Sequence, residues 1–558
     1  MAKKAAFLTS ALLGLANAAQ QCKARNLPAF DLPGIKIVNL KSEERRDYEW
    51  KSALETVAVP VMIPIKNDAP ISFCSITVTY THIGQNDTIN TVVWLPIDGK
   101  WNGNYLGLGG GGWAAGGLDS LGGGVALGYA TANTDAGHSY VPDERHDFVL
   151  NAESWGYLSK ENVHWVNLQN FASIALDDLP KIAKHVIGGF YDKAPKYSYF
   201  SGCSTGGRQG LVSAQRFPEN YNGILSVAPA INWATFLVTE LWPHVLMHRE
   251  NYWPEPAEFA AITEAAFESC DALDGVKDGV ISDAEVCKFD AKDAVGLSYS
   301  SNNEIRKVSA KAAKIANAIW EGPKKDGEKM WYGNTHETKF GGPMPFDGLA
   351  STACDSNNKN CKSAYFPIAE NWNKLFVQKD KDFDVTTMTE NDLWKALAKS
   401  RREYTSIIDT ADPDLSEFKA AGGKIVNWHG LADQIIPPGG MTDYYKRVKA
   451  LDPDVESFYR FFEAPGIEHC SGGPGAFPAD ALSSLVDWVE NGRAPKTLDA
   501  ATIPSSSSDV VSTRILCPWP KVAAYKGGDS TKASSFECAD TIDQFSSKWG
   551  AEGSHGEL

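Results

Sequence analysis

Two kinds of hydrophobic repeat organise the first 190 residues of the chain. The segments ISFCSITVTYTHI (71–83) and NTVVWLPI (90–97) are extended runs in which apolar positions recur with the period of strands. Residues 170–190 repeat their apolar positions with a helical period, and Gly188-Gly189 is expected to end that helix. Between these segments, residues 104–117 predict a glycine-rich loop, and residues 125–139 predict another strand that leads into a loop.

Strands and helices then follow one another in turn. Residues 196–218 predict a strand, a sharp turn and a helix, and residues 223–230 predict a short buried strand. Residues 422–438 and 456–473 each predict a strand with a loop at its carboxyl end, and a helix follows at 478–492. This order is typical of a mostly parallel sheet, so we expect an α/β fold.

Residues 232–405 differ from the segments on either side of them. They are rich in tryptophan, charged residues and irregular loops, and they carry four of the ten cysteines. We therefore expect one α/β domain built from residues 19–231 and 406–558, with an insertion of roughly 170 residues that is large enough to form its own unit.

The first 18 residues have the pattern of a secretory signal peptide. Lys3 and Lys4 precede the apolar residues 5–15, and Ala-Asn-Ala at 16–18 forms a cleavage site. The alternative is a buried N-terminal helix. No later segment has about 18 consecutive apolar residues, so we expect a secreted protein without a membrane anchor. The net charge of −16 makes nucleic acid or an anionic membrane an unexpected partner.

The expected secretion favours disulfides for the ten cysteines. A zinc site is the weaker interpretation, because no paired CxxC motifs at zinc-binding spacing occur. Spacing suggests four local pairs, although the sequence alone does not fix connectivity: Cys22–Cys74, Cys270–Cys287, Cys354–Cys361 and Cys517–Cys538. Cys203 and Cys470 remain. The sequon at Asn86, between two strand-like runs, predicts glycosylation if the host is eukaryotic.

The segment GCSTGG (202–207) contains a G-x-S-x-G pattern between a predicted strand and a predicted helix. This is the context of a nucleophile elbow, with Ser204 as the nucleophile, and the alternative is a plain strand-to-helix turn. A serine needs a base and an orienting carboxylate, which follow it in the order acid, then histidine. Asp433 and His469 have this order, and each lies just past a predicted strand.

Two other histidines have weaker claims. His429 ends a strand but precedes Asp433, so we interpret it as a structural loop residue. His138 either lines the site or forms hydrogen bonds within its own loop.

Cysteines flank the proposed nucleophile and base, because Cys203 precedes Ser204 and Cys470 follows His469. If the two cysteines are bonded, their Cα atoms lie about 4.4–6.8 Å apart. Such a bond would hold the serine and the histidine close together.

An oxyanion formed at Ser204 needs two backbone N–H donors. Thr205, the next residue, supplies one by its position, and the GGGGW loop (109–113) is expected to supply the other from Gly111 or Gly112. A phosphate-binding loop is the rival interpretation, but no Gly-Lys-Ser/Thr follows.

Acidic residues gather between Cys270 and Cys287. The carboxylates of Asp271, Asp274 and Asp278, with the carbonyl oxygens of Val276 and Val280, would suit Ca²⁺. The loop is not an EF-hand, because Ser282 stands where that motif has glutamate. A solvated acidic turn is the alternative.

The motifs GCSTGGRQG, HGLADQIIPP and EHC together resemble those of the fungal and bacterial tannase and feruloyl esterase family, over nearly the whole chain after residue 18. The resemblance implies an α/β-hydrolase fold and a Cys203–Cys470 disulfide, the signature of that family. It also implies a lid domain at 232–405 that covers Ser204 and carries the calcium loop. The implied activity is hydrolysis of esters of plant phenolic acids.

The expected function is a feruloyl esterase that releases hydroxycinnamic acids from plant cell-wall polysaccharide or from small phenolic esters. The uncharged Thr205 weakly favours this over a tannase, which cuts gallate esters. A secreted serine peptidase would keep the same triad. The non-enzymatic alternative is a calcium-dependent protein that binds the cell wall.

Overall fold

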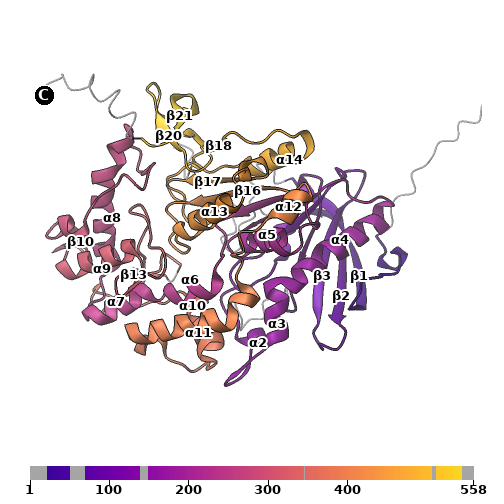
Figure 1. The fold of residues 1–558 in the computed structure, drawn as a ribbon, viewed down its shortest axis with the longest axis horizontal. Coiled ribbons are helices and arrows are strands. Elements are labelled where there is room, and N and C mark those ends of the chain that lie inside the picture. The colour runs from indigo at the N-terminus through magenta and orange to yellow at the C-terminus, as the bar shows by residue number, and fades with distance from the viewer. Residues whose placement is uncertain (1–21, 51–68, 139–148, 345, 505–509, 543–558) are drawn as a thin grey trace, which may run out of the picture.

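The computed structural model describes residues 22–50, 69–138, 149–344, 346–504 and 510–542, and its architecture is shown in Figure 1. The expected signal peptide, residues 1–18, lies outside the described residues.

A nine-stranded sheet forms the centre of the α/β part, in the order β1-β2-β3-β5-β4-β8-β9-β16-β17. The neighbours from β1 to β5 pair antiparallel, and those from β5 to β17 pair parallel. The strands are β1 (Ile35–Tyr48), β2 (Ile71–His82), β3 (Ile89–Pro96), β4 (Tyr105–Leu108), β5 (Ala130–Thr134), β8 (Ser198–Cys203), β9 (Gly223–Val227), β16 (Lys424–Gly430) and β17 (Tyr459–Ala464).

Helices cover both faces of the sheet, so the parallel strands are buried on both sides and read as continuous apolar runs. Successive residues of one strand enter different cores: Ile425 packs on the side of α4, α5 and α13, whereas Val426 packs on the side of α1 and α14. These helices are α1 (Leu121–Ala126), α4 (Ala175–Tyr191), α5 (Thr205–Arg216), α13 (Gly439–Leu451) and α14 (Ala481–Asn491).

The expected end of a helix at Gly188-Gly189 is wrong, because α4 continues through both glycines to Tyr191. A glycine inside a helix costs only about 1 kcal/mol, which packing of the apolar face offsets. Gly189 also permits a close contact, because a Cβ atom there would lie 2.5 Å from Cδ of Pro28.

The chain leaves the sheet after β9 and returns to it at β16. The described residues between them form seven α-helices, of which α12 is given below and the others are α6 (Trp233–Thr239), α7 (Trp242–Glu250), α8 (Pro256–Cys270), α9 (Ala310–Glu321), α10 (Pro367–Asn371) and α11 (Glu390–Ile408). They also form three small sheets: β10 (Ser298–Ser301) with β11 (Glu304–Lys307), β12 (Lys324–Lys325) with β13 (Glu328–Lys329), and β14 (Thr352–Ala353) with β15 (Lys362–Ser363).

In Figure 1, α7, α8 and α9 lie at the end of the molecule opposite β1 and β2. The expected boundary after residue 405 falls inside α11, which runs to Ile408. The extent of the insertion as a separate domain stays a prediction.

Shorter elements complete the described fold. Two hairpins of the tail are β18 (Leu498–Ala501) with β19 (Thr513–Leu516) and β20 (Val522–Tyr525) with β21 (Phe536–Ala539). The others are α2 (Glu153–Gly156), α3 (Trp165–Gln169), α12 (Ser416–Ala420) and the pair β6 (Tyr157–Ser159) with β7 (Asn162–Val163). An isolated bridge joins Phe462 of β17 to Pro518, so the tail pairs with this edge strand of the sheet.

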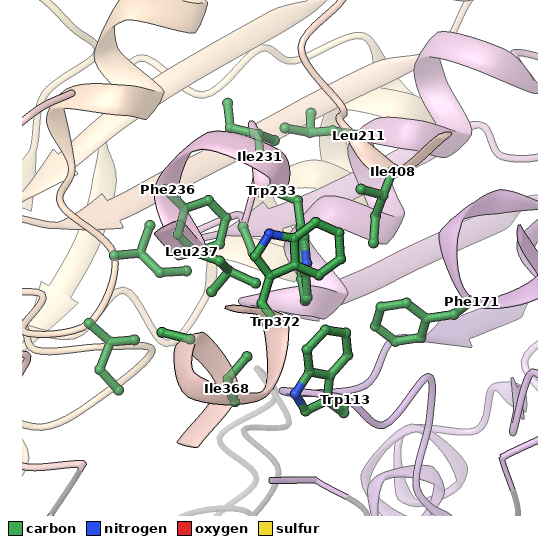
Figure 2. Close-up of a cluster of buried hydrophobic side chains, with 14 of the residues drawn as sticks. Trp113, Phe171, Leu211, Ile231, Trp233, Phe236, Leu237, Ile368, Trp372 and Ile408 are labelled. Carbon is green, nitrogen blue, oxygen red and sulfur yellow. The ribbon is translucent and has the colours of Figure 1, made fainter. Parts of the chain in front are cut away.

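An aromatic cluster joins the insertion to the sheet (Figure 2). Trp233 of α6 lies 5.3 Å, between ring centroids, from Trp113 of the glycine-rich loop, and Trp372 lies 6.2 Å from Trp113. Arg208 of α5 is fully buried, and its guanidinium lies over the rings of Phe171 and Trp233. The cluster packs the start of the insertion against the loop and the helix that adjoin Ser204.

Candidate active site

Ser204 lies at the sharp turn between β8 and α5. Its φ of 62° and ψ of −121° are unusual for a residue with a side chain, as a nucleophile elbow requires. The turn needs glycine at Gly202, because a Cβ atom there would lie 2.6 Å from the backbone carbon of Gly206. The close approach of strand and helix therefore explains Gly202, whereas a Cβ atom at Gly206 would lie 2.9 Å from the carbonyl oxygen of Gly110 in the glycine-rich loop.

Asp433 and His469 follow the ends of β16 and β17, which are parallel neighbours, so both lie at one edge of the sheet. Nδ1 of His469 lies 2.8 Å from Oδ2 of Asp433. The other carboxylate oxygen accepts backbone N–H bonds from Ile435 (2.9 Å) and Ile436 (2.8 Å). Burial would raise the pKa of Asp433, but the charge of His469 and hydrogen bonds from both His429 and His469 hold it well below its usual range.

His429 contacts the same carboxylate, which our interpretation of it as a loop residue missed. Its Nε2 lies 3.0 Å from Oδ2 of Asp433 and 3.1 Å from the carbonyl oxygen of Ile436. Both neighbours are acceptors, so Nε2 carries the hydrogen. Nδ1 is buried and has no hydrogen-bond partner in the described part of the chain. The only sequence signal for this contact is a histidine at the carboxyl end of a strand, four residues before the aspartate.

A disulfide joins Cys203 to Cys470, with 5.9 Å between their Cα atoms. It links the residue before Ser204 to the residue after His469. Within the described residues, the Ser204 hydroxyl makes no hydrogen bond to His469. Such bonds are often long in enzymes without substrate. The covalent bridge is therefore what ties the serine to the histidine here.

The glycine-rich loop after β4 packs on the N-terminus of α5. The Thr205 hydroxyl donates to the carbonyl of Gly112 (2.6 Å), and the N–H of Gly206 donates to the carbonyl of Gly110 (3.0 Å). The backbone N–H groups of Thr205, Gly111 and Gly112 donate to no acceptor in the described ranges. Within the described ranges, no protein acceptor therefore occupies any of the three expected oxyanion donors.

Hydrogen bonds between the insertion and the α/β part hold the loop that carries His469. Gln434 accepts from the His469 backbone N–H (3.0 Å) and donates to the carbonyl of Phe346 (3.3 Å). Glu337 is buried, and its carboxyl accepts backbone N–H bonds from Gly466 (3.1 Å) and Ile281 (3.3 Å). Burial raises the pKa of Glu337 to about 8. The insertion thus contacts the His469 loop directly through Glu337 and indirectly through Gln434.

The carboxylates of the acidic loop already have hydrogen-bond or ion-pair partners within the protein. Asp271 accepts from the N–H groups of Asp278 and Gly279, and Asp274 accepts from the N–H of Val276 and the hydroxyl of Ser282. The tail's Arg514 pairs with Asp278 at 2.6 Å. In the described part of the chain, no three His, Cys, Asp or Glu side chains are arranged to hold a metal ion.

The donor chemistry of this loop nevertheless fits a hard cation. Asp271 and Asp274 are buried, and burial, together with the charges of Asp278 and Asp271, raises the pKa of Asp274 to about 6. Close carboxylates destabilise one another's charged forms, and a divalent cation would neutralise them.

The remaining predicted residues are placed as follows. The structure contains five disulfides: Cys22–Cys74, Cys203–Cys470, Cys270–Cys287, Cys354–Cys361 and Cys517–Cys538. Asn86 is exposed in the loop between β2 and β3. His138 is buried and stacks on Trp155 with 3.6 Å between ring centroids, and neither of its ring nitrogens has a hydrogen-bond partner in the described residues.

Comparison with known proteins decides the family. Residues 74–539 match the family model described as tannase and feruloyl esterase. The chain belongs to this family. The resemblance drawn from the three motifs is therefore confirmed, and so is the α/β-hydrolase fold.

Named members of the tannase and feruloyl esterase family match nearly end to end. A probable feruloyl esterase from Arthroderma benhamiae is 39% identical over 518 residues, covering 91% of this chain and 92% of the relative. A tannase from Aspergillus oryzae is 27% identical and covers 84% of this chain and 85% of its own. The solved structure of a tannin acyl hydrolase from Aspergillus niger has a TM-score of 0.82 at 27% identity, covering 94% of this chain and 95% of its own.

These relationships make this tannase and feruloyl esterase family member a carboxylic ester hydrolase, as expected. Its five disulfides are typical of proteins from oxidising compartments. Among the described helices, none is long and apolar enough to cross a membrane.

Proposed function

We propose that this chain is a secreted serine esterase that releases ferulic and related hydroxycinnamic acids from plant cell-wall polysaccharide or small phenolic esters. The observation that carries the mechanism is the Cys203–Cys470 disulfide, which ties the Ser204 elbow to a histidine bonded to Asp433. The 39% identical relative named a probable feruloyl esterase supports the choice of substrate class.

The proposed reaction follows the triad. His469 donates Nδ1–H to Asp433, which leaves Nε2 to accept the proton of Ser204. The Ser204 oxygen attacks the ester carbonyl, and the C–O bond to the alcohol breaks as His469 returns the proton to the leaving oxygen. His469 then takes a proton from water, whose oxygen attacks the acyl carbon. The C–O bond to Ser204 breaks as His469 returns the proton to the Ser204 oxygen, which releases the phenolic acid.

The negative oxygen of each tetrahedral intermediate would accept bonds from the Thr205 N–H and from that of Gly111 or Gly112. Gly111 has open space around its Cα, since a Cβ atom there would meet nothing within 4 Å. Gly112 has a φ of 55°, in the left-handed region that favours glycine. The Thr205 hydroxyl bond to the Gly112 carbonyl fixes the loop relative to the elbow. Preorganised donors of this kind contribute much of the rate enhancement in acyl transfer.

The nearest alternative is a tannase, which the same triad would serve. The tannase from Aspergillus oryzae and the tannin acyl hydrolase from Aspergillus niger, both 27% identical to this chain, favour it. The two activities differ in the acyl pocket, because three ring hydroxyls of gallate need more hydrogen-bond partners than one hydroxyl and a methoxy group.

Secretion, glycosylation and a metal complete the proposal. Residues 1–18 would direct export, the exposed Asn86 would carry a glycan, and the disulfides fit an oxidising compartment. Structural Ca²⁺ would be held by the acidic loop, through the carboxylates and carbonyls of Asp271, Asp274, Val276, Asp278 and Val280. Its part would be to hold the loop next to Ile281, which bonds to Glu337.

The test is a specificity ratio. We would compare kcat/KM of the purified enzyme on methyl ferulate, methyl caffeate and methyl gallate, with Ser204→Ala as the control. Dominant turnover of the hydroxycinnamates supports the feruloyl esterase, and dominant turnover of gallate supports the tannase. Turnover of peptides but of no phenolic ester would indicate a peptidase, and binding without any turnover in the parent protein would indicate the non-catalytic alternative.

A further inference from the structure

Glu240 is a buried acid that the triad does not use. It caps the C-terminal end of α6, and its residue is only 3% exposed. Both carboxyl oxygens are buried, and neither has a hydrogen-bond partner in the part of the chain that the structure describes. A buried polar group without a partner is costly, so one that persists calls for an occupant beside it.

Glu240 is one of the residues that line a small cavity with a volume of about 20 Å³. Its lining includes Glu240, Trp242, Trp331, Tyr332, Asn334 and Pro437. The indole N–H of Trp331 is also buried without an acceptor in the described residues. This volume admits one group the size of water or a hydroxyl. Two residues that line this space therefore carry unpaired polar groups, one a donor and one a carboxyl, and the space has the size of a single hydroxyl group.

The cavity adjoins the loop that carries the catalytic acid. The Asn334 side chain donates to the backbone carbonyl of Asp433 at 3.4 Å, and Pro437 belongs to the same loop. Glycines at the start of α13 seat the aromatic wall, because Cβ atoms at Gly439 and Gly440 would lie 2.7 Å from Tyr332 and Trp331. The wall of the cavity and the Asp433 loop are thus one packed unit.

The carboxyl of Glu240 is suited to a neutral partner. Burial raises its pKa well above the usual range, and the nearby negative charge of Asp433 raises it further. A protonated carboxyl both donates and accepts a hydrogen bond, whereas a carboxylate only accepts. A phenolic hydroxyl, which also donates and accepts, is complementary to it.

We propose that Glu240 and the indole N–H of Trp331 form the site that recognises a ring hydroxyl of the phenolic acyl group. This inference rests on the proposed function and adds a specificity-determining residue to it. A site that hydrogen-bonds a substrate hydroxyl rejects the analogue without it, because its own buried groups are then left unpaired.

The test compares methyl 4-hydroxycinnamate with methyl cinnamate, which differ by one hydroxyl. For the parent enzyme we expect kcat/KM to favour the hydroxylated ester by about tenfold or more. In Glu240→Leu this ratio should fall to near 1, whereas Glu240→Gln, which keeps a donor and an acceptor, should retain most of it. Glu321→Leu makes the same change at an exposed glutamate of the insertion and should leave the ratio unchanged.

A second variant guards against misfolding of Glu240→Leu. Trp331→Phe removes the indole N–H but keeps an aromatic ring. It should also lower the ratio of kcat/KM on methyl 4-hydroxycinnamate to that on methyl cinnamate. A parent-like ratio in Glu240→Leu or, if that variant does not fold, in Trp331→Phe would mean that the cavity holds only a buried water, and would overturn the inference. A parent enzyme that hydrolyses both esters equally would overturn it while leaving the esterase intact. A parent enzyme that hydrolyses neither would overturn the proposed function as well.

Discussion

His429 donates its Nε2–H to the carboxylate of Asp433 at 3.0 Å, beside the bond from His469 to the same oxygen. Asp433 therefore accepts four hydrogen bonds, two on each oxygen, and is fully buried. A carboxylate held at four points has one orientation available, and that orientation directs Nδ1 of His469. His429 is thus placed to act on the reaction through Asp433, without touching substrate.

Replacing His429 by leucine should therefore lower kcat rather than raise KM. Loss of one hydrogen bond to a charged group is worth roughly 10- to 100-fold in rate if it loosens the catalytic acid. Steady-state kinetics on the preferred phenolic ester would measure this, and the pH profile of kcat should change because the environment of the Asp433–His469 pair changes. His429→Gln, which restores an N–H donor, should recover part of the rate. Equal kcat in parent and leucine variants would rule out a positioning role.

The Cys203–Cys470 bridge should matter for both activity and stability. Replacing both cysteines by alanine frees the elbow from the His469 loop, and kcat should fall by about tenfold or more because the serine and its base lose their fixed separation. The bridge spans 267 residues, and chain entropy alone assigns such a loop about 5 kcal/mol of unfolding free energy.

The matched control is the double alanine variant of Cys354 and Cys361, a disulfide that spans only 7 residues of the insertion. This control should retain the parent kcat, and its melting temperature should fall less than that of Cys203→Ala/Cys470→Ala. Circular dichroism would establish that both double variants are folded before kinetics are compared. Parent-like turnover in Cys203→Ala/Cys470→Ala would contradict the preorganising role.

Much of the sheet was predictable because its strands are buried in a regular way. In β2 every second residue from Cys74 to Tyr80 is buried, and β8 and β9 are buried throughout, which are patterns that periodicity detects. β1 was missed because a register shift between Ile37 and Asn39 interrupts the alternation of its half-buried apolar residues, and the rest of this edge strand is mostly exposed and charged. β4 was hidden inside a run interpreted as a glycine-rich loop, although Tyr105–Leu108 is wholly buried.

The order of Ser204, Asp433 and His469 was predictable for a different reason. The carboxyl ends of parallel strands lie at one edge of a sheet, so residues just past three such strands meet whatever their separation in sequence. The contacts of His429 and Glu240 depend instead on side-chain conformation and on the insertion's packing. For Glu240 a signal existed, since it is the one charged residue in the apolar run from Phe236 to Leu246.

Removal of calcium should destabilise the protein if the acidic loop binds it. A bound ligand at 100 times its Kd stabilises a fold by about 2.7 kcal/mol, so excess chelator should lower Tm by several degrees. Asp274→Asn should abolish both the bound calcium, measured by elemental analysis, and the response to chelator. Asp326→Asn, in an exposed turn of the insertion, should keep both the bound calcium and the fall in Tm on adding chelator. A metal-free parent protein with the same Tm in chelator would refute the site.

His244 should make the fold sensitive to mild acid. It is 2% exposed, neither ring nitrogen has a partner within the described ranges, and burial lowers its pKa to about 3. Because the folded pKa lies below the unfolded value, the neutral ring's contribution to stability is present above pH 6.5 and is lost as pH falls toward 3. Between pH 6.5 and 5 this loss amounts to about 2 kcal/mol of unfolding free energy.

Replacing His244 by phenylalanine removes the group that must be charged while keeping a ring beside Tyr365. We therefore expect the fall in unfolding free energy from pH 7 to 5, measured by denaturant titration, to be smaller in His244→Phe than in the parent. His248 lies exposed on the same helix, α7, and His248→Phe should leave the parent's pH dependence in place. An identical pH dependence in parent and His244→Phe would show that His244 finds a partner for its charged form. The buried ring would then not be a source of acid sensitivity.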